Sequence, residues 1–179
     1  MAMDNRRAQL VRTILNCLGE NPPYADNDRG VDLDHRIKIQ KLVYLAQELL
    51  KRHRMTLHYE DYNWYIRGPY SPALARDCYA LDEEGAEAVE LLQLRDEAVS
   101  ALAPLASLKG SRPPELEPHL WLELLASLHY YATRSRCSEL DTAQLSAERM
   151  HGFQSQKSGF SATSIEFAWR KLREAGLVG

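Results

Sequence analysis

The period of the hydrophobic pattern changes inside one stretch of the chain, Lys38 to Pro72, and this change restricts the possible folds. Up to about residue 50 the apolar side chains follow the spacing of an amphipathic helix: Ile39, Leu42, Val43, Ala46, Leu49 and Leu50. From Tyr62 to Ile66 the period becomes two, which predicts a short strand. Gly68-Pro69 is expected to break that strand, and Ser71 suits the N-cap of a helix that begins at Pro72.

Helical spacing dominates the rest of the chain. It occupies residues 5–18, 118–128, 141–150 and 161–175, and Gly176 is placed to end the last helix in a left-handed conformation. The pattern of residues 86–108 is ambiguous and is interrupted at Pro104, while residues 151–159 predict a loop. The predicted class is mostly α: a compact helical domain with one or two short strands, as a minor β-hairpin or a winged-helix-like element.

Residues 109–115, KGSRPPE, are rich in turn-forming residues and predict the boundary between two parts of the chain. We expect a helical core domain over residues 1–108. A C-terminal helical or winged-helix-like subdomain over residues 115–179 is expected to pack on it. Trp121 and Trp169 in the second part offer one route to a homodimer.

The composition argues for a protein of the cytoplasm. The formal net charge is -3, which lacks the strongly basic footprint of a nucleic-acid-binding domain. No apolar run reaches the roughly 18 residues of a membrane-spanning helix, and the N-terminus lacks the apolar core of a secretory signal. Cys17, Cys78 and Cys137 are odd in number and widely spaced, which favours a reducing compartment over a disulfide framework.

The sequence carries no motif that indicates catalysis. Nucleophile elbows, phosphate loops and dinucleotide-binding glycine motifs are absent from the sequence. None of the six histidines stands at the spacing of a metal-binding pair: His35, His53, His58, His119, His129 and His151. We therefore expect no enzyme activity, no metal and no cofactor.

The aromatic segment from Tyr59 to Tyr70 is the strongest candidate for a binding site. A strand of alternating residues buries only one face, so some of its rings should be accessible to a partner protein, for which Tyr, Trp and Arg are favoured contacts. The predicted partner-binding residues, expected on the exposed part of that surface, are Lys38, Lys41, Tyr65, Arg67 and Tyr70. The helical period places Lys38 and Lys41 on the solvent-facing side of their helix. Two alternatives remain open: the rings cover the domain's own core, or they stack on nucleic-acid bases beside a basic residue.

The C-terminal helices offer an alternative function, DNA binding. The segment FAWRKLREAGLV is similar to a winged-helix recognition segment, and the positive charge there comes from Lys157, Arg170, Lys171 and Arg173. Glu166 and Glu174 lie on the same helix and reduce that charge. The long loop before the helix also differs from a tight helix-turn-helix.

Residues 37–81 resemble small bacterial proteins of the SocA-like (Panacea) class and the similar YwgA-like proteins. The shared pattern joins a K-x-QKL-x-YL helix to an aromatic strand, a Gly-Pro turn and a capped helix. Its positions here are Lys38, Gln40, Lys41, Leu42, Tyr44, Leu45, Trp64, Gly68, Pro69, Ser71, Leu74 and Asp77.

This resemblance implies a binding module without enzyme activity. SocA-like domains act as antitoxins or as proteolytic adaptors that hold a toxin, and YwgA-like proteins occur in mobile or defence contexts. A toxin or a phage-defence effector is therefore the expected partner. The chain departs from the SocA-like pattern in its longer helical second half and in the GPYS turn at residues 68–71.

Overall fold

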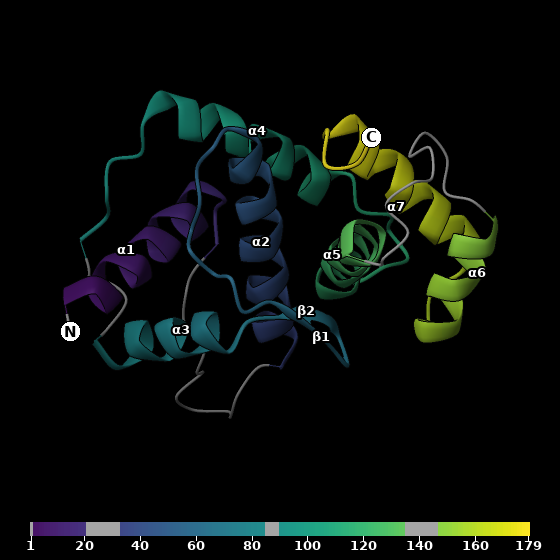
Figure 1. Ribbon diagram of the computed structural model, residues 1–179, viewed down its shortest axis with the longest axis horizontal. Helices are drawn as coiled ribbons and strands as arrows, with labels where there is room; N and C mark the ends of the chain where they lie inside the picture. The colour runs from purple at the N-terminus through teal and green to yellow at the C-terminus, as the bar shows by residue number, and fades with distance from the viewer. Residues whose placement is uncertain (1, 21–32, 85–89, 135–146) are drawn as a thin grey trace.

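The computed structural model describes residues 2–20, 33–84, 90–134 and 147–179 (Figure 1). Its elements, in chain order, are α1 Ala2–Cys17, α2 Leu33–Arg52, β1 Asn63–Tyr65, β2 Gly68–Tyr70, α3 Pro72–Glu84, α4 Asp96–Gly110, α5 Pro118–Arg134, α6 Ala147–Gln156 and α7 Ala162–Glu174. The predicted mostly-α class with one minor β-hairpin is confirmed.

Helix α2 is the central element of the fold. It packs against α1, α4, α5 and the hairpin, and it stands between α1 and α5 in Figure 1. Because neighbours cover α2 on several sides, burial is not restricted to the predicted apolar stripe and includes the polar residues Gln40, Lys41 and Gln47. The apolar core around α2 is continuous from Val11 in α1 to Leu172 in α7.

Two glutamines of α2 attach the aromatic segment to the helix. The Gln47 side chain donates to the backbone carbonyl of Tyr59 and accepts from its N–H, each at 2.9 Å. Gln40, two helical turns earlier, makes the same double contact with the backbone of Ser71, at 3.1 and 3.0 Å. Each amide replaces the backbone partner that a neighbouring strand would provide. The segment between residues 59 and 71 is thus held at both ends.

Gly68-Pro69 does not act as the predicted strand break, because β1 already ends at Tyr65 and the pair itself lies in β2. Trp64 pairs with Pro69 in the antiparallel register, and Tyr65 pairs with Gly68 across a two-residue turn. Hydrogen-bonded and non-bonded pairs alternate in such a hairpin. The Tyr65–Gly68 pair flanks the turn and is the bonded type, so Pro69 stands where no ladder N–H is needed.

Gly68 meets two requirements that other residues do not. Its φ is +82°, a left-handed conformation that costs other residues strain. A Cβ placed there would stand 2.0 Å from the Oγ of Ser127 in α5, which is closer than any real contact. The hairpin therefore approaches α5 at a position that only glycine can occupy.

The predicted cap of α3 is confirmed, and α7 begins where it was predicted. The Ser71 Oγ accepts from the N–H of Leu74 at 3.0 Å, and Asp61 accepts from the Ser71 hydroxyl and from the N–H of Ala73. At the other end of the chain, Ser161 caps α7 through the N–H of Ser164 at 3.1 Å.

The last helix ends in the predicted Schellman motif. Gly176 has a φ of +69°, and its N–H donates to the carbonyl of Arg173. The N–H of Leu177 donates to the carbonyl of Leu172, which completes the motif.

Other details of the second half differ from the predictions. Helix α4 continues through Pro104 to Gly110, so this proline does not interrupt it. Residues 151–156 belong to α6 and are not a loop, because α6 covers Ala147–Gln156. The start of the helix predicted over residues 141–150 lies outside the described residues, up to residue 146. The predicted boundary at residues 109–115 stays a prediction.

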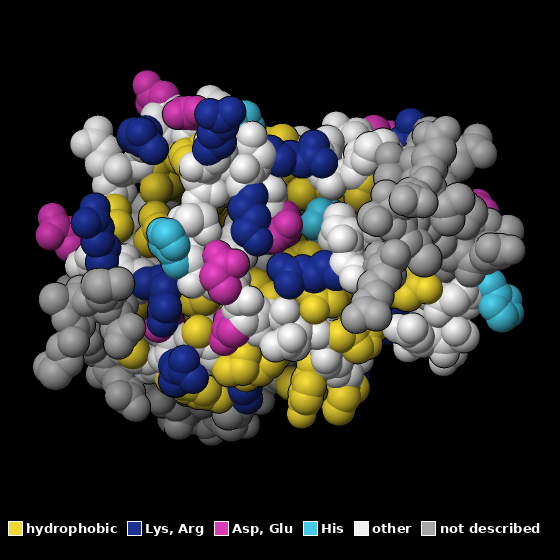
Figure 2. All heavy atoms as spheres, viewed as in Figure 1, with side chains coloured by type: hydrophobic (Ala, Val, Ile, Leu, Met, Phe, Trp, Pro, Cys, Tyr) yellow, Lys and Arg dark blue, Asp and Glu magenta, His cyan; other side chains and the backbone are white. Residues whose placement is uncertain are grey.

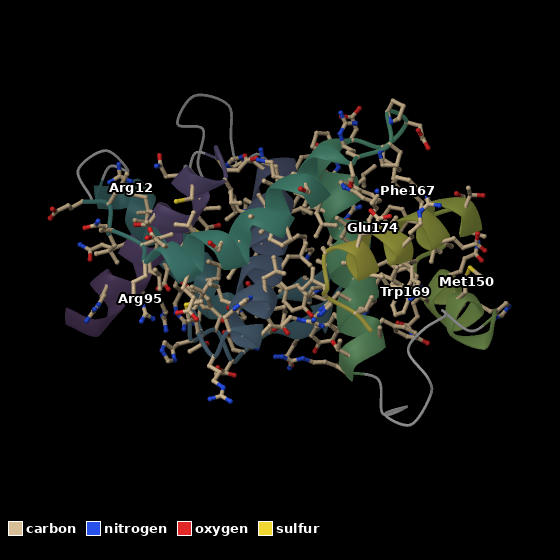
Figure 3. All side chains as sticks on the ribbon, turned by 90° about the horizontal axis from the view of Figure 1, so that it is seen from above. Arg12, Arg95, Met150, Phe167, Trp169 and Glu174 are labelled. Atoms are coloured by element: carbon tan, nitrogen blue, oxygen red, sulfur yellow. The ribbon has the colours of Figure 1, made fainter. Side chains whose placement is uncertain are left out.

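The predicted dimer contacts are wrong. Trp121 is 1% exposed, and its indole N–H donates to the carbonyl of Leu108 at 2.8 Å. Trp169, labelled on α7 in Figure 3, is 6% exposed. Both rings belong to the apolar core where α4, α5 and α7 meet, so neither can form an interface between two copies.

Candidate functional site

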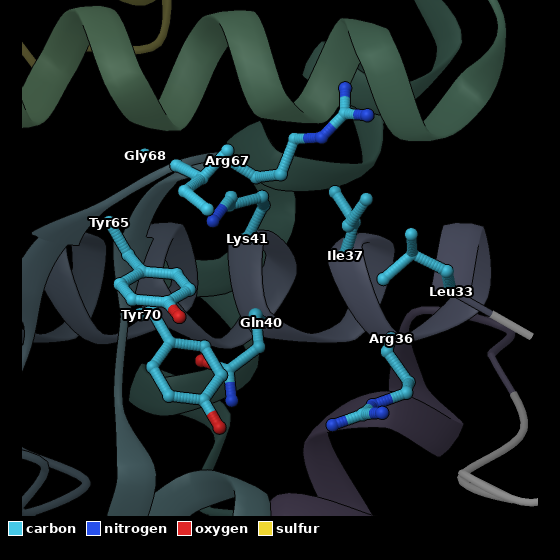
Figure 4. A pocket seen from close by; sticks show the side chains of 10 residues that line it. Leu33, Arg36, Ile37, Gln40, Lys41, Tyr65, Arg67, Gly68 and Tyr70 are labelled. Atoms are coloured by element: carbon cyan, nitrogen blue, oxygen red, sulfur yellow. The ribbon is translucent and has the colours of Figure 1, made fainter. Parts of the chain in front are cut away.

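A pocket of about 390 Å³ lies between the first half of α2 and the hairpin (Figure 4). All of its lining residues come from these two elements: Leu33, Arg36, Ile37, Gln40, Lys41, Tyr65, Ile66, Arg67, Gly68 and Tyr70. The double contact between Gln40 and Ser71 fixes the distance between its two walls.

The outer part of the pocket is apolar and exposed. Tyr65, Ile66 and Leu33 are 61%, 77% and 57% exposed, respectively. The rings of Tyr65 and Tyr70 lie side by side with their centroids 5.7 Å apart. Figure 2 shows hydrophobic side chains gathered at the lower edge of this face, where the hairpin lies in Figure 1. Large exposed apolar groups gathered around a concavity are typical of a binding surface.

The charge of the pocket lining is entirely positive. Arg36, Lys41 and Arg67 contribute side chains to it, and none of the described lining residues is acidic. The Arg36 guanidinium lies 5.4 Å from the centre of the Tyr79 ring. Arg67 extends from the hairpin along α5 in Figure 4, with half of its side chain exposed. The pocket thus combines apolar walls with cationic groups.

Lys41 is the most buried of these cations. It is 2% exposed, and its ammonium donates to the carbonyl of Pro69 at 2.6 Å. Burial lowers the pKa of Lys41 to about 7, because a charged ammonium loses its water there; Glu123 opposes this shift, and Lys157 and Arg67 add to it. Near neutral pH this amine is therefore divided between its charged and neutral forms.

Glu123 of α5 is the carboxylate nearest to this group of cations and is itself 3% exposed. Its Oε1 accepts from Lys157 at 2.7 Å, and its Oε2 lies 3.5 Å from the Arg67 guanidinium. Lys157 also donates to the carbonyl of Ile66 at the hairpin turn. Both carboxylate oxygens thus face cations other than Lys41. We call Lys41, Arg67, Glu123 and Lys157 the buried ion cluster.

Four of the five predicted partner-binding residues line this one pocket: Lys41, Tyr65, Arg67 and Tyr70. The prediction that Lys41 is exposed is wrong, because the hairpin and α5 cover the face of α2 that carries it. Lys38 lies elsewhere on α2 and pairs with Glu20 at 2.6 Å.

The four predicted nucleic-acid-binding residues divide into two groups. Lys157 is 7% exposed and belongs to the buried ion cluster, so its charge is directed at Glu123 and is not presented on the surface. Lys171 pairs with Glu174 at 2.5 Å, and Arg170 lies 5.1 Å from the Phe167 ring. Arg173 is exposed on the same helix. Nucleic-acid binding by α7 stays a prediction with a smaller set of charges.

The sequence interpretation did not include Arg36 and Glu123. Glu123 carries a signal that was present in the sequence: it is a single acidic residue within the apolar run from Leu120 to Leu128. A lone carboxylate in a buried helix requires a cation as partner. Arg36 carries no comparable signal, because an arginine near the start of a helix is common on surfaces.

Two further sets of polar side chains in the core, one around Asp77 and one formed by Tyr44 and His129, have structural partners. Asp77 accepts from Arg7 at 2.6 Å and from the Tyr59 hydroxyl at 2.5 Å. The Tyr44 hydroxyl and the His129 Nδ1 lie 2.8 Å apart, and burial lowers the pKa of His129 to about 4. Within the described residues, no group of three or more His, Cys, Asp or Glu side chains is arranged to hold a metal ion.

No family model, no curated protein and no solved structure matches this chain. The expectations that follow from the resemblance of residues 37–81 are therefore predictions. In the part of the chain that the structure describes, no helix has the length and apolar character needed to cross a membrane.

Proposed function

We propose that this protein is an interaction module without enzyme activity that binds a partner protein in the pocket between α2 and the hairpin. The main support for this proposal is that the pocket combines exposed apolar side chains, above all Tyr65 and Ile66, with charged lining residues that are all basic. Tyrosine and arginine provide large contact areas in protein interfaces, and the rings here are held by a fixed backbone.

The chemistry of the lining defines the proposed partner. A segment that presents an apolar side chain next to a negatively charged one would complement the exposed Leu33 and Tyr65 at the rim and the half-exposed Arg67, which leads inward to Lys41. A toxin or a defence effector with such a segment fits the resemblance of residues 37–81, which supports this proposal. Homodimerisation through the same pocket is a different outcome, which the experiment below distinguishes by the identity of the bound chain.

Site-specific photo-crosslinking in the native cell tests the proposal. A benzophenone amino acid replaces Ile66, which is 77% exposed at the hairpin turn, and in a control protein it replaces Val99, which is 50% exposed on α4. We expect one discrete protein adduct from position 66 and none from position 99. Mass spectrometry should place the crosslink in a partner segment that contains Asp or Glu beside an apolar residue.

Two additional variants make the result decisive. Tyr65→Ala and Arg67→Gln, each combined with the crosslinker at position 66, should weaken or remove the adduct while leaving the protein folded, which its circular dichroism spectrum checks. Equal adducts from positions 66 and 99, or an adduct that survives both substitutions, would contradict the proposal. Nucleic acid that co-purifies and dissociates in salt would instead support binding by α7.

A further inference from the structure

We infer that the inner end of the pocket is an oxyanion-binding site, in which Lys41 and Arg67 receive a carboxylate or a phosphate group. The identification of this group as part of a partner protein rests on the proposed function. The site itself does not, because it is defined by the charges of this chain alone.

The buried ion cluster carries more positive than negative charge. It holds three basic side chains, Lys41, Arg67 and Lys157, but one carboxylate, that of Glu123. Both oxygens of Glu123 face Lys157 and Arg67, at 2.7 and 3.5 Å. The hydrogen bond described for Lys41 goes to a neutral carbonyl, that of Pro69. The cluster therefore carries an excess of positive charge, one unit when Lys41 is neutral and two units when it is protonated.

Lys41 can be reached from the pocket. Although it is 2% exposed, it lines the pocket, and its side chain points from α2 toward the hairpin in Figure 4. An ammonium has three donors, and the carbonyl of Pro69 uses one of them. Arg67 lines the same pocket and has a half-exposed guanidinium. A group entering between them would meet two cationic donors in a largely apolar enclosure.

Anion binding would also relieve an energetic cost at Lys41. A buried charge without a counter-ion is unfavourable, and the protein can relieve this by releasing the proton or by binding an anion. The groups that face the Lys41 amine from α5, the hairpin and the segment after α6 are Glu123, Arg67 and Lys157. An oxyanion supplied by a ligand would restore the balance of charges that Glu123 leaves incomplete. Binding and protonation of Lys41 should therefore occur together.

The experiment uses the intact chain without any partner. Lysine Cε groups are labelled with carbon-13, the Lys41 signal is assigned with Lys41→Met, and its titration is followed by NMR at constant ionic strength. The probes are acetate, which represents a carboxylate, and inorganic phosphate. We expect Lys41 to titrate near pH 7 in chloride and at higher pH when either probe saturates the site.

The affinity should depend on pH because the anion binds the protonated amine. With a pKa of about 7, acetate should bind about tenfold more weakly at pH 8 than at pH 6. Arg67→Gln should weaken binding several-fold, whereas Arg173→Gln, an exposed arginine of α7 outside the pocket, should not. Tighter binding of acetate would identify a carboxylate ligand, and tighter binding of phosphate would identify a phosphorylated one.

Three results would overturn the inference. A Lys41 titration that neither probe moves would mean that the site does not receive oxyanions. An equal shift of Lys41 and of Lys171, which pairs with Glu174 on the surface of α7, would indicate a general salt effect. Titration of Lys41 in chloride near 10.5, the ordinary pKa of a lysine, would show that its charge is already compensated. Since no partner is present, these outcomes are independent of the crosslinking result.

Discussion

Replacing Glu123 by glutamine should destabilise the protein strongly, because it removes the one carboxylate of the buried ion cluster. Removing one partner of a buried ion pair typically costs about 3–5 kcal/mol, since the remaining charge stays buried without compensation. The Lys157 side chain is 6% exposed and cannot turn to water, whereas the Arg67 side chain is 49% exposed and can. We therefore expect the lower end of that range, about 3 kcal/mol.

A matched control comes from the surface of α7. Glu174→Gln breaks the pair with Lys171, but the Glu174 side chain is 53% exposed, so the expected cost is about 0–1 kcal/mol. Urea unfolding followed by circular dichroism gives both free energies of unfolding. In the double variant Glu123→Gln/Lys157→Met, the charge that lost its partner is also gone, and part of the stability should return. Equal losses for Glu123→Gln and Glu174→Gln would refute the reasoning.

Three further predictions concern the fold around the pocket. Gly68→Ala should cost about 2–4 kcal/mol, because it strains a left-handed residue and drives a Cβ into Ser127. Gly110→Ala, at a glycine with open space, should cost far less in the same urea assay. Ser71→Ala removes the α3 cap and should cost about 1 kcal/mol, measured in the same way. Burial lowers the pKa of His129 from 6.5 to about 4, so this imidazole takes up a proton more readily in the unfolded chain than in the folded one. The free energy of unfolding should therefore fall as the pH drops from 6.5 to 4. The loss, up to about 3 kcal/mol, should shrink in His129→Gln when unfolding is measured across that pH range; a wild-type profile that is flat in this window would contradict the reasoning.

Local features of the sequence predicted most of the helices. The helical period predicted α2, α5 and α7, the cap residue Ser71 was placed correctly, and the start of α7 was predicted near Ser161. Such predictions succeed because a cap depends on residues within about one turn of itself. The predicted strand break at Gly68-Pro69 failed because whether a proline fits a strand depends on the register of its partner, which no local pattern contains.

The site was predicted only in part. Tyr65 was predicted because a short alternating strand leaves one face without cover, and Arg67 and Tyr70 because Tyr and Arg near such a strand are favoured contacts of protein interfaces. Lys41 was assigned to the solvent-facing side of α2. The helical period separates polar from apolar positions, but it does not show which of the polar positions another element of the fold covers. The cover comes from Pro69 and Glu123, 28 and 82 residues further along the chain, respectively. The ion cluster was therefore missed.

The attachment of the hairpin by Gln40 and Gln47 has a consequence for the order of folding. Strands of three residues do not form a stable hairpin alone, and these contacts span 31 and 12 residues of sequence. The hairpin should therefore acquire its shape only after α2 has formed and met it, so an excised hairpin peptide would not reproduce the pocket. Because the pocket exists only when the hairpin is attached to α2, a ligand that contacts both α2 and the hairpin binds only the folded chain. It would slow the opening of the hairpin as well as fill the pocket.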